Sequence, residues 1–123
     1  MAFLAGFEIS NDAIGSTSMK LELIVNPNGH SFRGFATVTN NSVHPAVDLK
    51  NVKIEGTAGK KPHEYSLHGG MLGGTVSGEL TLPDGWGGAG TFVGHDSANG
   101  VYGQSLEGVA QPIESFEDQA VLA

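Results

Sequence analysis

Residues 19–41 read MKLELIVNPNGHSFRGFATVTNN, and this stretch decides the fold. Over residues 19–25 apolar side chains stand at every second position, and this alternation places one face of a β-strand on a core. The segment Asn26-Pro27-Asn28-Gly29 then reverses the chain, because proline presets φ early in a turn and glycine accepts the positive φ that ends it. Residues 32–38 alternate again on the return. The stretch therefore predicts a β-hairpin.

Two signals compete for the register of this hairpin. A tight turn with Gly29 as a bulge would set Leu23 opposite Arg33. The hydrophobic pattern instead sets Leu23 opposite Phe32, so that both side chains are buried. A slip of one residue turns every side chain of a strand to the other face, and burial usually decides between registers. We therefore expect Leu23 opposite Phe32, and a positive φ at Gly29.

The rest of the chain repeats this pattern of short strands, each with alternating apolar side chains, separated by turns. Further strands are expected at residues 2–9, 47–56, 63–68, 75–82, 88–95 and 101–111. The phase of alternation changes at Lys50-Asn51, which predicts a β-bulge. Asn99-Gly100 is typical of a two-residue hairpin turn and would pair Val93 with Leu106. Gly100 should then also have a positive φ.

About eight short strands, with no convincing helix before residue 112, predict an all-β antiparallel fold. A meander of eight strands loses its exposed edges when it closes into a small barrel. A two-sheet β-sandwich is the alternative. We expect residues 1–111 to form the barrel domain and residues 112–123 to form an acidic amphipathic tail. A short helix in this tail would gather its apolar side chains on one stripe: Ile113, Phe116, Ala120 and Val121.

Composition and charge narrow the functional class. The chain has 19 glycines, which suit turns and close backbone contacts, and no cysteine. Its net charge is −7, and residues 61–123 hold eight acids but a single base, Lys61. The scattered bases form no stripe for phosphates, which argues against nucleic acid. No apolar run is long enough to span a bilayer, and the opening MAFLAGFEIS lacks the basic segment of a signal peptide. We expect a soluble cytoplasmic protein.

No motif points to a catalytic, metal or cofactor site. None of the five histidines has a partner at ligand spacing, so we expect no metal and no cofactor. Ser105, His95 and Asp96 lack the G-x-S-x-G element of a hydrolase, and we expect no catalytic residue. The glycine-rich segment 85–90 surrounds the only tryptophan, Trp86, which either stacks on a ligand or packs over a neighbouring strand. The candidate binding residues are Trp86, His95 and Tyr65.

Several segments resemble a family of small bacterial proteins that carry a domain of unknown function. The segments are Phe3-Leu4, Met19-x-Leu21-x-Leu23-x-Val25, Gly34-x-Ala36-x-Val38-Thr39, Pro45-x-Val47-Asp48, Glu79-Leu80 and Trp86-x-x-Ala89. The resemblance covers most of the chain except residues 57–75. It implies a compact bacterial β domain with no assigned activity and no functional residues to carry over.

Two functions of different class follow from these expectations. The first is a non-catalytic binding or assembly module. The second is a small barrel enzyme or small-molecule carrier, since an eight-stranded barrel is either filled by side chains or holds one ligand. The tail offers an interaction element through Ile113, Phe116 and Val121, which would serve a protein partner or self-association, or else cover the end of the barrel itself.

Overall fold

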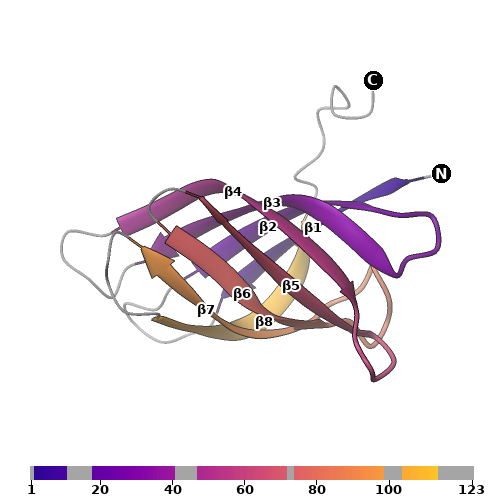
Figure 1. Ribbon diagram of the computed structural model, residues 1–123. Coiled ribbons are helices and arrows are strands. Elements are labelled where there is room, and N and C mark those ends of the chain that lie inside the picture. The colour runs from indigo at the N-terminus through magenta and orange to yellow at the C-terminus, as the bar shows by residue number, and fades with distance from the viewer. Residues whose placement is uncertain (1, 11–17, 41–46, 72–73, 99–103, 114–123) are drawn as a thin grey trace.

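Eight antiparallel strands form a closed barrel in the computed structural model (Figure 1). The structure describes residues 2–10, 18–40, 47–71, 74–98 and 104–113. The strands are β1 (Phe3–Ser10), β2 (Ser18–Val25), β3 (Ser31–Asn40), β4 (Val47–Ala58), β5 (Glu64–Met71), β6 (Gly74–Thr81), β7 (Gly90–Ala98) and β8 (Gln104–Ile113). Each strand pairs with the next, and β8 returns to pair with β1. The barrel is therefore confirmed, and the sandwich alternative is wrong.

Apolar side chains fill the interior of the barrel, as the alternation predicts. The buried apolar side chains are Ala5, Phe7, Ile9, Met19, Leu21, Leu23, Val25, Phe32, Ala36, Val38, Val52, Ile54, Tyr65, Leu67, Val76, Leu80, Leu82, Phe92 and Ala110. Charged side chains alternate with them on the same strands and are exposed or half-buried, as at Lys20, Glu22, Arg33, Lys53 and Glu55. Among the described residues, no helix has the length and apolar character needed to cross a bilayer.

The central hairpin has a longer turn than predicted. Val25 lies opposite Phe32, and Leu23 lies opposite Gly34, so the predicted pairing of Leu23 with Phe32 is wrong. Asn26 N donates to Ser31 O at 2.9 Å, which leaves residues 27–30 in the turn. The burial argument still holds, because Val25 and Phe32 share the inner face. Gly29 has a φ of 74°, which confirms that part of the prediction.

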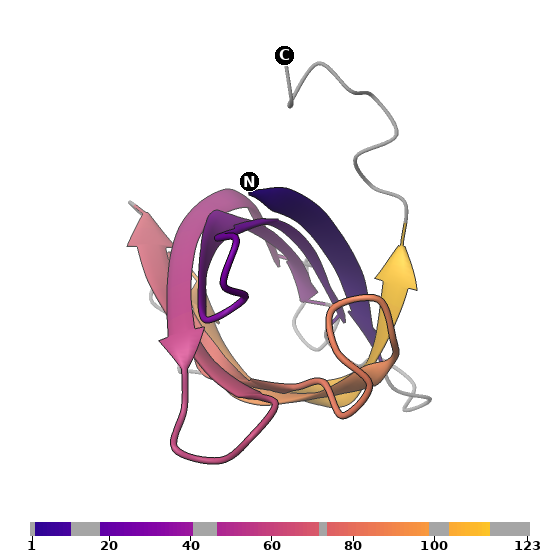
Figure 2. The ribbon, with the colours of Figure 1, turned by 90° about the vertical axis from the view of Figure 1, so that its right-hand side faces the viewer.

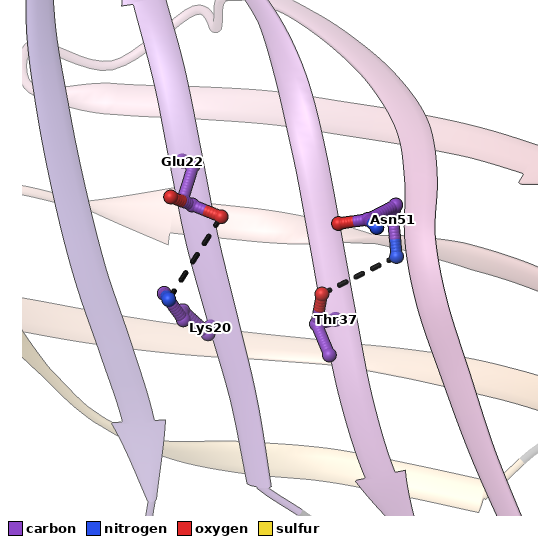
Figure 3. A network of polar contacts seen from close by, with 4 residues as sticks. All are labelled: Lys20, Glu22, Thr37 and Asn51. Carbon is purple, nitrogen blue, oxygen red and sulfur yellow. Dashed lines mark hydrogen bonds and ion pairs between the residues drawn. The ribbon is translucent and has the colours of Figure 1, made fainter. Parts of the chain in front are cut away.

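The predicted bulge in the fourth strand is confirmed. Ala36 of β3 pairs with Val52 and Val38 pairs with Leu49, so β4 holds one extra residue between these pairs. Asn51 has a φ of 54°, and its backbone N–H donates to Thr37 Oγ1 at 3.3 Å (Figure 3). Val52 and Ile54, which follow the bulge, are buried. The extra residue shifts the alternation of the strand by one position, which explains the change of phase in the sequence.

The last hairpin differs from its predicted register by one residue. Val93 lies opposite Glu107, and Gly94 lies opposite Leu106, so the pairing of Val93 with Leu106 is wrong. The reason is burial: Phe92 is the inward residue of this part of β7, and Val93 is 58% exposed. The predicted turn at residues 99–100, and with it the φ of Gly100, lies outside the described residues.

Glycines make room for aromatic rings inside the barrel. Gly56 lies opposite both Phe32 and Leu67, and Gly78 lies opposite Leu67. A Cβ atom on Gly56 would come within 2.2 Å of the Phe32 ring, and one on Gly78 within 2.4 Å of the Phe92 ring. Large residues and glycines thus alternate across neighbouring strands, which packs the narrow interior. These two glycines are required by packing rather than by a turn.

Candidate functional site: an aromatic barrel end and a charged outer wall

Three connections close the end of the barrel that faces the viewer in Figure 2. They are the β2–β3 turn (residues 26–30), the β4–β5 loop (residues 59–63) and the β6–β7 loop (residues 82–89). Backbone hydrogen bonds join this end together: Leu82 N donates to His63 O at 2.9 Å, and Ala58 N donates to His30 O at 2.7 Å. The turns Pro27-Asn28-Gly29 and Pro83-Asp84-Gly85 therefore lie at the same end, and Gly29 and Gly85 both have a positive φ.

Trp86 covers this end from the β6–β7 loop. Its ring centroid lies 4.6 Å from that of Tyr65 and 5.5 Å from that of Phe32. Phe3 and Phe7 each lie at 6.4 Å. Such aromatic pairs contribute about 0.5–1.5 kcal/mol each beyond the burial of their area. Trp86 thus packs over the other aromatic rings at this end. This agrees with the interpretation that the glycine-rich segment lets the Trp86 ring pack over neighbouring strands.

The structure brings together only two of the residues that sequence reasoning selected for binding. Tyr65 and Trp86 lie in the aromatic cluster, and both of their rings pack on other aromatic rings. His95 stands in β7 with its backbone between Ser77 and Ser105. It is five positions from the start of that strand, or about 16 Å along it. Its side chain lies outside the described residues, so its binding role stays a prediction.

The last strand ends two residues later than predicted, at Ile113. Ile113 is the last residue of β8 and pairs with Gly6 of β1, so its place on a helical stripe is wrong. The strand extends that far because Pro112 and Ile113 lie opposite Phe7 and Gly6 of β1, where the barrel closes. Phe116 and Val121 lie outside the described residues, and their interaction role stays a prediction.

Charged side chains are confined to the outside of the barrel. Every aspartate, glutamate, lysine, arginine and histidine whose side chain the structure describes is exposed or half-buried. The described residues contain no group of three or more histidine or carboxylate side chains placed to hold a metal ion. The polar side-chain atoms of the aromatic cluster are the Tyr65 hydroxyl and the Trp86 indole Nε1, and the indole donates to the carbonyl oxygen of Gly29. Acid–base or metal chemistry would need convergent polar groups, and the described interior is apolar.

An open pocket of about 400 Å³ lies on the outer wall over β2 to β5. Its lining residues are Ile24, Arg33, Gly34, Phe35, Lys53, Ile54, Glu55, Gly69 and His68. Phe35 is 41% exposed although it is aromatic. Glu55 pairs with His68 across β4 and β5 at 3.5 Å. Sequence reasoning missed this wall, although Phe35 stands in the outward phase of its strand and could have signalled it.

A scan against protein-family models finds no match to the chain, and a search of curated proteins finds none either. The resemblance to a bacterial family carrying a domain of unknown function therefore stays a prediction.

Proposed function

We propose that the protein is a non-catalytic binding or assembly module that works through its outer surface. The observation that supports this proposal is that the two faces of the sheet carry different kinds of side chain. The inner face is apolar and buried, whereas the described charges lie outside. Binding modules need exposed recognition groups, while enzymes and carriers need polar or open space inside a pocket. The cytoplasmic location predicted from the sequence stays a prediction.

The alternative, an enzyme or carrier that uses an interior cavity, is less well supported. Phe7, Leu23, Leu80 and Phe92 point into the barrel and are almost completely buried. A ligand entering from the end in Figure 2 would have to displace Trp86 and its four aromatic contacts. Both observations favour a filled barrel over a container.

An apolar dye tests the proposal against the carrier alternative. The probe is 1-anilinonaphthalene-8-sulfonate, added while the methyl resonances of Leu23 and Leu80 are followed by NMR. We expect these resonances to stay in place over the whole titration. Saturable one-to-one binding that shifts them would overturn the proposal. The variant Trp86→Ala, which opens the end of the barrel, is the positive control for dye reaching the interior.

A further inference from the structure

The two sides of the barrel differ in net charge, although β2 and β4 also hold three acids: Glu22, Asp48 and Glu55. All six basic residues lie on β2 to β4 or in the loop after β4: Lys20, Arg33, Lys50, Lys53, Lys60 and Lys61. Strands β5 to β8 and the β6–β7 loop hold only acids: Glu64, Glu79, Asp84, Asp96 and Glu107. In a closed ring of eight strands, β3 and β7 stand four positions apart and so face away from each other (Figure 2).

The basic wall consists of Ile24, Arg33, Phe35 and Lys53. Ile24 lies opposite Arg33, and Phe35 lies opposite Lys53. Within the described part of the chain, neither Arg33 nor Lys53 forms an ion pair. The nearby acids also have contacts of their own: Glu22 lies 3.9 Å from Lys20 (Figure 3), and Glu55 lies 3.5 Å from the His68 imidazole. Phe35 thus lies between Lys53 and Glu22, and Arg33 lies between Ile24 and Glu55, so this wall carries both signs of charge.

The acidic wall consists of Glu79, Val93, Glu107 and Val109. Glu79 and Glu107 lie on either side of Val93, on the neighbouring strands. Val93 is 58% exposed and Val109 is 46% exposed. On this wall Val93 thus lies between two acids, whereas on the basic wall Phe35 lies between an acid, Glu22, and a base, Lys53.

We infer that these two walls bind each other in different copies of this chain, with the basic wall of one copy on the acidic wall of the next. The inference rests on the proposed function and names its partner as a second copy. One barrel cannot join its own two walls, because they face away from each other. The contact is therefore head-to-tail, and such contacts propagate into open chains when no rotation closes them.

The association should be weak and sensitive to salt. Exposed ion pairs contribute little individually and are screened at high ionic strength. Sedimentation velocity on the full chain over a range of concentrations measures it. We expect the average sedimentation coefficient to rise with concentration past the value of a dimer, and this rise to disappear in about 0.5 M salt.

Charge reversal on each wall identifies the contact. Lys53→Glu reverses a charge on the basic wall, and Glu79→Lys reverses a charge on the acidic wall. Each variant alone should therefore stay monomeric. An equimolar mixture should associate again, because each variant supplies the intact wall that the other lacks. Lys60→Glu and Glu8→Lys make the same charge changes away from both walls and should behave like the unmodified chain. Circular dichroism checks that every variant is folded.

Four results would overturn the inference. They are a monomer at all concentrations, growth that stops at a dimer, a mixture that stays monomeric, or association lost only when residues 114–123 are removed. Each of these leaves the dye experiment unaffected. A monomer whose interior takes no dye refutes the head-to-tail contact alone, whereas dye binding inside the barrel refutes the proposed function itself.

Discussion

The indole Nε1 of Trp86 donates a hydrogen bond to the carbonyl oxygen of Gly29 at 3.3 Å. This bond ties the β6–β7 loop to the turn of the central hairpin, 57 positions earlier in the chain. The same ring packs on the aromatic cluster below it, so one side chain both covers and fastens this end of the barrel.

Two substitutions of Trp86 should separate the contribution of ring packing from that of the hydrogen bond. Trp86→Ala should lower the free energy of unfolding by about 3 kcal/mol, the lower end for large aromatic residues, because the ring is only partly buried. Trp86→Phe keeps most of the packing and loses the hydrogen bond, so we expect a loss of about 1 kcal/mol. Urea denaturation followed by circular dichroism measures both. Equal losses would contradict the packing contribution, and an unchanged stability in Trp86→Phe would contradict the assigned hydrogen bond.

Gly29→Val should destabilise the protein by more than about 1 kcal/mol. Gly29 has a φ of 74°, which a β-branched residue adopts only with strain. A Cβ there would also lie 3.4 Å from Trp86 Nε1. Gly87→Ala is the matched control, because its Cβ would meet nothing within 4 Å. Thermal unfolding compares the two variants, and similar melting temperatures would show that the turn does not need glycine.

Leu23→Ala should cost about 2–5 kcal/mol of stability. The Leu23 side chain has an exposed fraction of 0% and lies in the core of the barrel. Lys20→Ala removes a longer side chain from the outside of the same strand and should change stability by less than about 0.5 kcal/mol. Guanidinium denaturation tests the pair, and a small effect at Leu23 would mean that the interior rearranges to fill the space.

Gly56→Ala should destabilise the barrel by about 1–3 kcal/mol through overpacking. The new methyl group would lie 2.2 Å from the Phe32 ring and 2.5 Å from the Ser66 carbonyl oxygen. Adding Phe32→Leu should recover part of the loss, since it removes the ring but leaves the carbonyl in place. A double-mutant cycle measures this coupling, and strictly additive losses would argue against the ring contact.

Removal of residues 114–123 distinguishes the two roles open to the tail. This deletion keeps Pro112 and Ile113, which pair with Phe7 and Gly6 in the sheet. If the tail covers its own barrel, the melting temperature should fall by several degrees while the mass in solution stays the same. If the tail is an interface, stability should hold while the mass or the capture of a partner changes. We expect the first outcome, measured by calorimetry and light scattering.

The sequence was sufficient for the fold because alternation and turn chemistry agree along most of the chain. Met19 to Val25 alternate cleanly, and the bulge at Asn51 was visible as a break in that alternation. The registers were harder to predict. The turn between β2 and β3 is longer than its Pro-Asn-Gly core, because Ser31 accepts a hydrogen bond from Asn26 and extends it. A short motif gives the type of a turn, whereas the contacts around it fix its length.

The candidate sites were less predictable because they depend on neighbours that are distant in sequence. Trp86 could be selected from its glycine-rich surroundings, but nothing in the sequence placed Phe3, Phe7 and Phe32 around it. The basic wall was missed for a similar reason. In the sequence, Arg33 and Lys53 are ordinary outward-facing residues of two strands. They form a surface with Phe35 only because the strand register sets Lys53 opposite Phe35, two positions from Arg33.

The pairing of β8 with β1 has a consequence for biosynthesis. Seven of the eight strand pairs join neighbours in sequence and can form soon after each strand leaves the ribosome. β1 obtains its second neighbour only when residues 109–113 are available. Closing so long a loop costs entropy, and an unpaired strand edge invites pairing with other chains. The nascent chain therefore spends most of its synthesis as an open sheet, and a chaperone that shields the outer edge of β1 would act during this interval.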